Sequence, residues 1–141
     1  KEKAPAAICR KVALAQDGGE IEVWGDGEQT RSFMYIDDCV EGIYRIMHSD
    51  CRDPLNLGTD ELVTINELVD IAAEIAGKVI RKRHDLSKPQ GVRGRNSDNS
   101  KLRQVLGWEP SISIREGLRP TYQWIENELR RTGRIPDPVA V

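Results

Sequence analysis

Two arginines carry the clearest chemical signal in this sequence. Arg31 follows a turn at Asp26-Gly27 and stands among alternating side chains that predict a short strand. Arg95 lies in a stretch with Pro and Gly that predicts a loop. A guanidinium keeps its charge and binds paired phosphate oxygens through two N–H groups. We therefore predict that both arginines grip one diphosphate; a surface arginine on an edge strand and a solvated loop cation are the alternatives.

Polar neighbours extend this predicted anion site. Gln29 and Thr30 bring an amide and a hydroxyl to the start of the strand, where they either hold sugar hydroxyls and phosphate oxygens or face water. Lys11, on a predicted helix, adds a point charge. These residue types favour a phosphorylated, hydroxyl-rich ligand.

The cysteines and histidines do not form a metal motif. Cys9, Cys39 and Cys51 contain no Cys-x-x-Cys pair, and His48 and His84 show no ligand spacing relative to them. Free cysteine is commonly buried, so we expect Cys39 to be a small core residue. The sequence predicts no metal site.

Length and composition favour one domain. The chain has 141 residues, of which 38% are hydrophobic and 31% charged, so it can bury one ordinary core. A net charge of -2 gives no general attraction to nucleic acid. Since no apolar run approaches the roughly 18 residues of a membrane span and no secretory signal is visible, we expect a soluble cytoplasmic protein. We place the domain at residues 1–132 and a flexible tail at residues 133–141.

Hydrophobic spacing predicts the first half of the elements. Pro5 suits the first turn of a helix that reaches Ala15. Strands are expected around residues 21–23 and over residues 32–36. Asp37 or Asp38 should cap the next helix. That helix is expected to bury one face, made by Val40, Ile43, Tyr44 and Met47.

The second half alternates short strands with capped helices. Brief strands are expected over residues 55–57 and 79–83, with a loop over residues 85–96. The helices are expected to be bounded by Thr64 with Glu67 and Gly77, by Ser97 or Asp98 and Gly107, and by Ser113 with Glu116. Pro120 should kink the last helix or make its start irregular. The predicted fold class is a mixed α/β lobe of small strands and helices.

Two glycine and arginine motifs resemble a known family. Residues 25–38 read Gly-Asp-Gly-x-Gln-x-Arg-x-Phe-x-Tyr-Ile-Asp-Asp, and residues 93–98 read Arg-Gly-Arg-Asn-Ser-Asp, followed by Leu-Gly-Trp-Glu-Pro at 106–110. Both resemble the substrate domain of the extended short-chain dehydrogenases/reductases, the NAD-dependent nucleotide-sugar epimerases and dehydratases. Residues 2–11 are similar to a narrower group of GDP-sugar epimerases in that family.

This resemblance implies that the chain is the carboxy-terminal, substrate-binding lobe of a larger enzyme. The sequence has no Gly-x-Gly-x-x-Gly after a strand and no Tyr-x-x-x-Lys, so the NAD(P)-binding Rossmann half is absent from it. NAD would be bound by that other half, which would also form the homodimer. The lobe alone is expected to be inactive and to bind a GDP-sugar, with no nucleic acid or membrane partner.

The resemblance also assigns roles to residues. Arg31 and Arg95 would hold the pyrophosphate, with Lys11, Gln29 and Thr30 as further substrate-binding residues. In the family the hexose is oxidised at C4 with NAD, protons at C3 and C5 are exchanged, and the hydride returns. By resemblance Lys3 is one proton carrier, a cysteine outside this chain is the other, and Glu2 and Ala4 line the sugar pocket.

Two other interpretations stay open. A different epimerase, dehydratase or decarboxylase of the same family shares the arginine motifs. A nucleic-acid or acidic-partner module would use a basic stretch in which Asp85 is the only acid. This stretch has no aromatic residue to stack on bases. Its basic residues are Lys78, Arg81, Lys82, Arg83, Lys88, Arg93 and Arg95. A purely structural interaction domain would instead show no affinity for nucleotide sugars.

Overall fold

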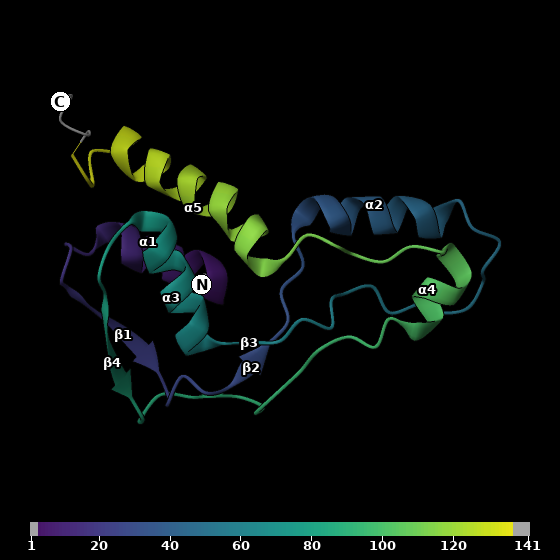
Figure 1. Ribbon diagram of the computed structural model, residues 1–141, viewed down its shortest axis with the longest axis horizontal. Helices are drawn as coiled ribbons and strands as arrows, with labels where there is room; N and C mark the ends of the chain where they lie inside the picture. The colour runs from purple at the N-terminus through teal and green to yellow at the C-terminus, as the bar shows by residue number, and fades with distance from the viewer. Residues whose placement is uncertain (1–2, 137–141) are drawn as a thin grey trace.

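Three helices and a small parallel sheet build the main body of the molecule (Figure 1). The computed structural model describes residues 3–136. Helices α1 (Ala4–Leu14), α3 (Ile65–Ala76) and α5 (Ile114–Arg131) pack on one another. Strands β1 (Glu20–Trp24) and β4 (Arg81–Asp85) pair beside them. The predicted mixed α/β fold class is thus confirmed.

One hydrophobic core holds these elements together. It is built from aliphatic side chains that recur at helical spacing on α1, α3 and α5 and at alternate positions of β1. Its most deeply buried members are Leu68, Val12, Val69, Cys9 and Ala72, each with no exposed surface. Burial raises the pKa of the Cys9 thiol to about 12, so Cys9 is a packing residue. Cys39, expected in the core, is only half-buried, and that prediction is wrong.

The parallel pair β1–β4 aligns Glu20 with Arg81 and Trp24 with Asp85. The strand predicted over residues 79–83 therefore begins and ends two residues later. Val79 instead donates its N–H to the Asp17 carboxylate at 2.7 Å and accepts from the Gly18 N–H at 2.8 Å. The turn before β1 thus holds Val79 outside the strand.

A second, antiparallel pair joins β2 (Thr30–Arg31) to β3 (Val63–Thr64). The prediction of a strand over residues 32–36 is wrong. Residues 32–35 are irregular and Ile36 begins the next helix. Ser32 donates its N–H to the Arg95 carbonyl at 3.2 Å, so a loop occupies the place of a neighbouring strand.

Local capping signals are confirmed for two helices. Thr64 and Glu67 form the capping box of α3, and Gly77 ends that helix in the left-handed region at φ 63°. Ser113 and Glu116 form the capping box of α5. Helix α5 continues through Pro120 without interruption.

Helix α4 (Ser100–Leu106) lies at the far end of the molecule from the sheet of β1 and β4 (Figure 1). Its N-cap is Asn99, one residue beyond the predicted cap; Asp98 accepts from the Ser100 N–H at 2.9 Å. Gly107 ends it at φ 58° as expected. Residues 55–57, predicted to be a strand, are irregular.

Helix α2 (Ile36–Met47) begins differently from the prediction. Its N-cap is Tyr35, whose side chain makes no capping bond, whereas Asp37 and Asp38 both lie in the first turn. Asp38 is buried, and its carboxylate accepts the N–H groups of Ser111 and Ile112 at 2.9 and 2.8 Å. Asp38 therefore ties α2 to the segment that enters α5.

Replacing Asp38 with alanine should lower the free energy of unfolding by about 2 kcal/mol, because two backbone donors in this partly buried position lose their acceptor. Denaturant unfolding with and without the substitution measures this loss. Asp37→Ala is the matched control, since Asp37 is exposed on the same turn. Equal losses in both variants would contradict this role of Asp38.

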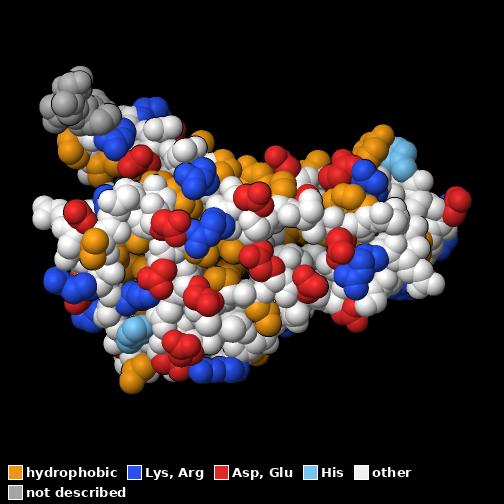
Figure 2. Space-filling model, in the orientation of Figure 1, with side chains coloured by type: hydrophobic (Ala, Val, Ile, Leu, Met, Phe, Trp, Pro, Cys, Tyr) orange, Lys and Arg blue, Asp and Glu red, His pale blue; other side chains and the backbone are white. Residues whose placement is uncertain are grey.

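The apolar face of α2 is exposed, contrary to prediction. Ile36, Val40, Ile43, Tyr44 and Met47 are 60%, 59%, 48%, 59% and 74% exposed. Figure 2 shows hydrophobic side chains gathered along the edge that α2 forms. The opposite side of the helix packs instead, where Gly42 approaches the side chains of Leu57 and Trp108.

The last described residues pack back on α5. Arg134 donates its N–H to the Leu129 carbonyl at 2.8 Å, and Ile135 packs against the core. Residues 137–141 of the predicted flexible tail lie outside the described residues, so the domain boundary stays a prediction. None of the helices within residues 3–136 is long and apolar enough to cross a membrane.

Candidate functional site

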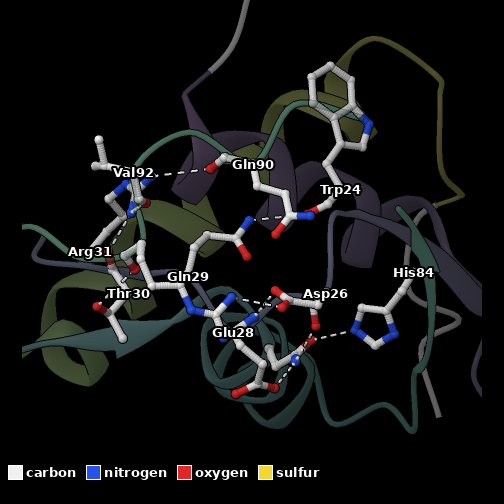
Figure 3. Close-up of polar contacts among 11 residues, drawn as sticks. Trp24, Asp26, Glu28, Gln29, Thr30, Arg31, His84, Gln90 and Val92 are labelled. Atoms are coloured by element: carbon white, nitrogen blue, oxygen red, sulfur yellow. Dashed lines mark hydrogen bonds and ion pairs between the residues drawn. The ribbon is translucent and has the colours of Figure 1, made fainter. Parts of the chain in front are cut away.

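Arg31 lies at the centre of a network that joins β2 to the loop before α4 (Figure 3). Its Nη1 donates to the carbonyl oxygens of Thr30 at 2.6 Å and Val92 at 2.7 Å. Its Nη2 donates to the Gln90 carbonyl at 3.4 Å. The side chain is half-buried, so this guanidinium sits at the seam between strand and loop.

The backbone brings Arg95 to the same seam. Thr30 donates its N–H to the Arg93 carbonyl at 2.8 Å, and Ser32 donates to the Arg95 carbonyl at 3.2 Å. Donors two residues apart reach acceptors two residues apart, so the loop runs alongside β2 in the same direction. The structure thus places the backbones of Arg31 and Arg95 side by side.

An ion pair braces the turn before β2. Arg93 donates to the Asp26 carboxylate at 2.7 Å, and this bond holds the pKa of that carboxyl below its usual range. Asn66, at the start of α3, donates to the Asp26 carbonyl at 3.1 Å and to Glu28 at 2.7 Å. His84 contacts the side-chain amide oxygen Oδ1 of Asn66 through Nε2 at 2.8 Å (Figure 3). The turn is therefore held by Arg93 and by Asn66, and His84 in turn contacts Asn66.

Gln29 is buried, with 7% of its surface exposed. Its amide nitrogen donates to the Trp24 carbonyl at 3.1 Å, which closes the turn between β1 and β2 (Figure 3). Its amide oxygen is buried without a hydrogen-bond partner among the described residues. The side chain therefore fixes the turn, whereas Thr30 is half-buried and directs its hydroxyl to the Arg93 carbonyl at 3.5 Å.

A cleft of about 370 Å³ adjoins exposed Arg95. Hydroxyl and amide side chains, one cation, the apolar side chains of Met34 and Leu57, and a glycine line it together: Ser32, Met34, Asn56, Leu57, Gly58, Thr59, Arg95, Asn96 and Ser97. Such a lining suits a ligand with phosphate and hydroxyl groups.

A second cleft, of about 250 Å³, lies at the start of α1. Ser32 and Met34 line both clefts, and Pro5 lines the second. Lys3, the N-cap residue of α1, is exposed two positions before Pro5. Residues 32–34 thus lie between the amino end of α1 and Arg95.

The remaining predicted site residues are Ala4, Lys11 and Glu2, and neither Ala4 nor Lys11 lines the cleft at Arg95. Ala4 is half-buried in the first turn of α1. Lys11 donates through Nζ to the Glu22 carbonyl at 2.7 Å, a contact that links α1 to β1 and leads away from the cleft at Arg95. Glu2 lies outside the described residues.

Several cleft residues were missed from the sequence. Asn56, Thr59 and Ser97 carry polar groups but stand in segments without periodicity. One signal was available: Gly58 allows close approach, since a Cβ atom there would lie 2.7 Å from the Ser97 Cβ. Sequence spacing does not show which residue approaches such a glycine.

The basic stretch considered for nucleic acid is largely paired. Lys78 donates to the carbonyls of Val12, Ala13 and Ala15 at the end of α1. Ion pairs in this stretch join Lys82 to Asp70, Arg83 to Glu20 and Glu22, Lys88 to Asp85, and Arg93 to Asp26. In each pair a nearby Asp or Glu offsets the positive charge of the basic side chain. Within the described part of the chain, no group of three or more metal-ligating side chains is placed to hold a metal ion.

Comparison with known proteins identifies relatives of this chain. A GDP-mannose 3,5-epimerase of Arabidopsis thaliana is 47% identical over 131 residues, which are 93% of this chain and 34% of the relative. A probable GDP-L-fucose synthase of Oryza sativa subsp. japonica is 36% identical over 89% of this chain and 39% of the relative. The chain thus spans about a third of the length of these curated relatives.

Solved structures with a similar fold include two sugar-nucleotide epimerases. A UDP-glucose 4-epimerase of Thermotoga maritima, solved with UDP-glucose, superposes with a TM-score of 0.80 at 29% identity over 90% of this chain and 40% of that one. A UDP-glucuronic acid 4-epimerase of Bacillus cereus, solved with UDP-glucuronic acid and NAD, gives 0.79 at 26% over the same shares. A family model described as GDP-mannose 4,6 dehydratase matches residues 1–121. The chain therefore belongs to that family, among the NAD-dependent epimerases/dehydratases that its motifs predict.

Proposed function

We propose that this chain is the substrate-binding part of a GDP-mannose 3,5-epimerase, which converts GDP-mannose into GDP-galactose and GDP-gulose epimers. The 47% identity to the Arabidopsis thaliana GDP-mannose 3,5-epimerase supports this assignment. The observation that carries it is the approach of residues 93–95 to β2, which brings the backbone of Arg31 beside that of Arg95, a residue that lines the cleft of about 370 Å³. A pyrophosphate needs such convergent donors.

In this proposal the diphosphate lies between Arg31 and Arg95. Three of the five Arg31 N–H donors bind carbonyl oxygens, so two donors are left for phosphate oxygens. Arg95 is exposed and adds a second guanidinium. Thr30 and Ser32 hydroxyls extend the donor set, whereas the buried Gln29 acts by closing the turn that leads into β2.

The hexose is proposed to occupy the cleft at the start of α1. Lys3, with Glu2 and Ala4, would face the sugar ring, and the Lys3 ammonium would give up or take the proton at one ring carbon. The exposed position of Lys3 at the start of α1, two residues from the cleft residue Pro5, supports this role.

Residues of this chain do not fit NAD. The parallel sheet has only two strands, β1 and β4, and the turn after β1 is closed by Gln29 and Asp26 instead of presenting a glycine-rich phosphate cradle. We propose that NAD, a hydride carrier, binds a separate domain that precedes this one. The lobe alone is accordingly expected to be inactive, and the homodimer and the cytoplasmic location belong to the same proposal.

A second candidate is another sugar-nucleotide enzyme of the family. A UDP-glucuronic acid decarboxylase of Arabidopsis thaliana is 38% identical over 79% of this chain. Titration with GDP-mannose and UDP-glucuronic acid separates the two candidates. Tighter binding of the GDP-sugar supports the epimerase, and the reverse order supports the second candidate.

Arg95→Ala should weaken GDP-mannose binding to this chain by roughly 10- to 150-fold, because a charge-assisted phosphate contact of about 1.5 to 3 kcal/mol is lost. Isothermal titration calorimetry measures the change, and Arg31→Ala is expected to weaken binding at least as much. Arg119→Ala, an exposed arginine on α5, is the matched control. Unchanged affinity in both site variants would reject the proposed diphosphate site.

A further inference from the structure

The loop that carries Arg95 has few attachments to the rest of the molecule. Residues 86–96 contain no helix or strand and are mostly exposed. Two backbone bonds, from Thr30 in β2 and from Ser32 just after it, join the loop to this edge. The Arg93–Asp26 ion pair is exposed on both sides, at 67% and 39%, and such pairs contribute little. The bonds from the Thr30 hydroxyl to the Arg93 carbonyl at 3.5 Å and from Asn96 to the Asp60 carbonyl at 3.4 Å are long, so a firmer attachment must come from another contact.

Arg31 supplies that contact. Its Nη1 donates at once to Thr30 on the strand and to Val92 in the loop, so one nitrogen bridges the two segments. Nη2 adds the Gln90 carbonyl. Gly91 separates these two loop acceptors at φ +72°, a left-handed conformation that turns both carbonyls toward the guanidinium. A Cβ atom at position 91 would lie 3.2 Å from Nη2.

We propose that Arg31 is the positioning residue of this loop and holds Arg95 beside β2 before any nucleotide sugar binds. The planar guanidinium fork is what allows one side chain to serve three carbonyls; a lysine ammonium cannot reproduce this geometry. The inference deepens the proposed function and rests on it for the identity of the ligand. It makes the two arginines unequal, because Arg31 prepares the position that Arg95 occupies.

The first test needs no ligand. Thr30 and Ser32 amides bond to the carbonyls of Arg93 and Arg95, so their hydrogen exchange reports whether the loop is docked. In Arg31→Lys, which keeps the charge, we expect these two amides to exchange at least tenfold faster, measured by NMR. Core amides of α3, such as those of Ile71 and Ala72, should keep their rates.

Arg103→Lys is the matched control, because Arg103 is exposed and pairs with Glu109 outside the seam. It should leave the exchange of Thr30 and Ser32 unchanged. Unchanged exchange in Arg31→Lys as well would overturn the proposal. Faster exchange throughout the core would do so too, since it would show a general loss of stability.

The second test measures the dependence of Arg95 on Arg31 with GDP as the probe. Arg31→Lys should weaken GDP binding about tenfold in the otherwise unchanged chain, but only about threefold when Arg95 is already alanine, because there only the direct phosphate contact of Arg31 is lost. Equal losses in both backgrounds would show independent action and overturn the positioning role. If the unchanged chain does not bind GDP, the proposed function fails, while the exchange experiment still decides whether Arg31 positions the loop.

Discussion

Lys3→Ala is expected to lower epimer formation by about 10² to 10⁴, the range typical of a lost general acid or base. Lys3 is the exposed N-cap residue of α1, two positions before Pro5, which lines a cleft that shares Ser32 and Met34 with the cleft at Arg95. The loss should appear in kcat, with GDP-mannose affinity changed less than threefold. The measurement is product analysis in the complete enzyme that contains the NAD-binding domain.

Two further variants make the role of Lys3 specific. Lys3→Arg keeps a positive charge but holds its proton too firmly to exchange it, so we expect it to be nearly as inactive as Lys3→Ala. Lys101→Ala, an exposed lysine on α4, should keep full activity. Near-normal epimerisation in Lys3→Ala would remove Lys3 from the proposed mechanism, and an equal loss of binding would make it a ligand-binding residue.

Leu68→Ala is expected to have the largest effect on stability. Leu68 has no exposed surface and lies on α3, which packs against α1. Truncating a fully buried leucine removes its transfer free energy and leaves a cavity, at a combined cost of about 2 to 5 kcal/mol. This is a large fraction of the roughly 5 to 15 kcal/mol by which domains are stable.

Urea unfolding followed by circular dichroism measures that loss as a lower midpoint at an unchanged slope. Leu62→Ala is the matched control, because Leu62 is 47% exposed and its truncation leaves no cavity. We expect a loss below about 1 kcal/mol there. Similar losses in the two variants would contradict the placement of Leu68 at the centre of the core.

The sequence predicted features that depend on neighbouring residues. The capping boxes at Thr64 and Ser113 and the left-handed glycines at 77 and 107 involve groups within a few positions of one another, and all four are confirmed. The family assignment also came from contiguous motifs, and the family model over residues 1–121 confirms it.

Features that depend on distant residues were not predictable in this way. The sequence suggests Asp38 as a helix cap. In the structure its carboxylate instead accepts the N–H groups of Ser111 and Ile112, which are 73 and 74 positions later. Residues 32–36 alternate as a strand does, but a loop more than 60 positions later takes up the Ser32 N–H. Gln29 reads as a ligand contact because burial is not visible in sequence. The diphosphate and proton-transfer roles stay predictions.

The uncovered face of α2 affects how solution data on this chain should be interpreted. Val40, Tyr44 and Met47 offer a native, well-formed apolar surface to any amphiphilic dye. Bright anilinonaphthalene sulfonate fluorescence is usually taken as a mark of a molten globule. Here the folded chain itself should produce that fluorescence, so loss of near-ultraviolet dichroism is the safer sign of lost packing.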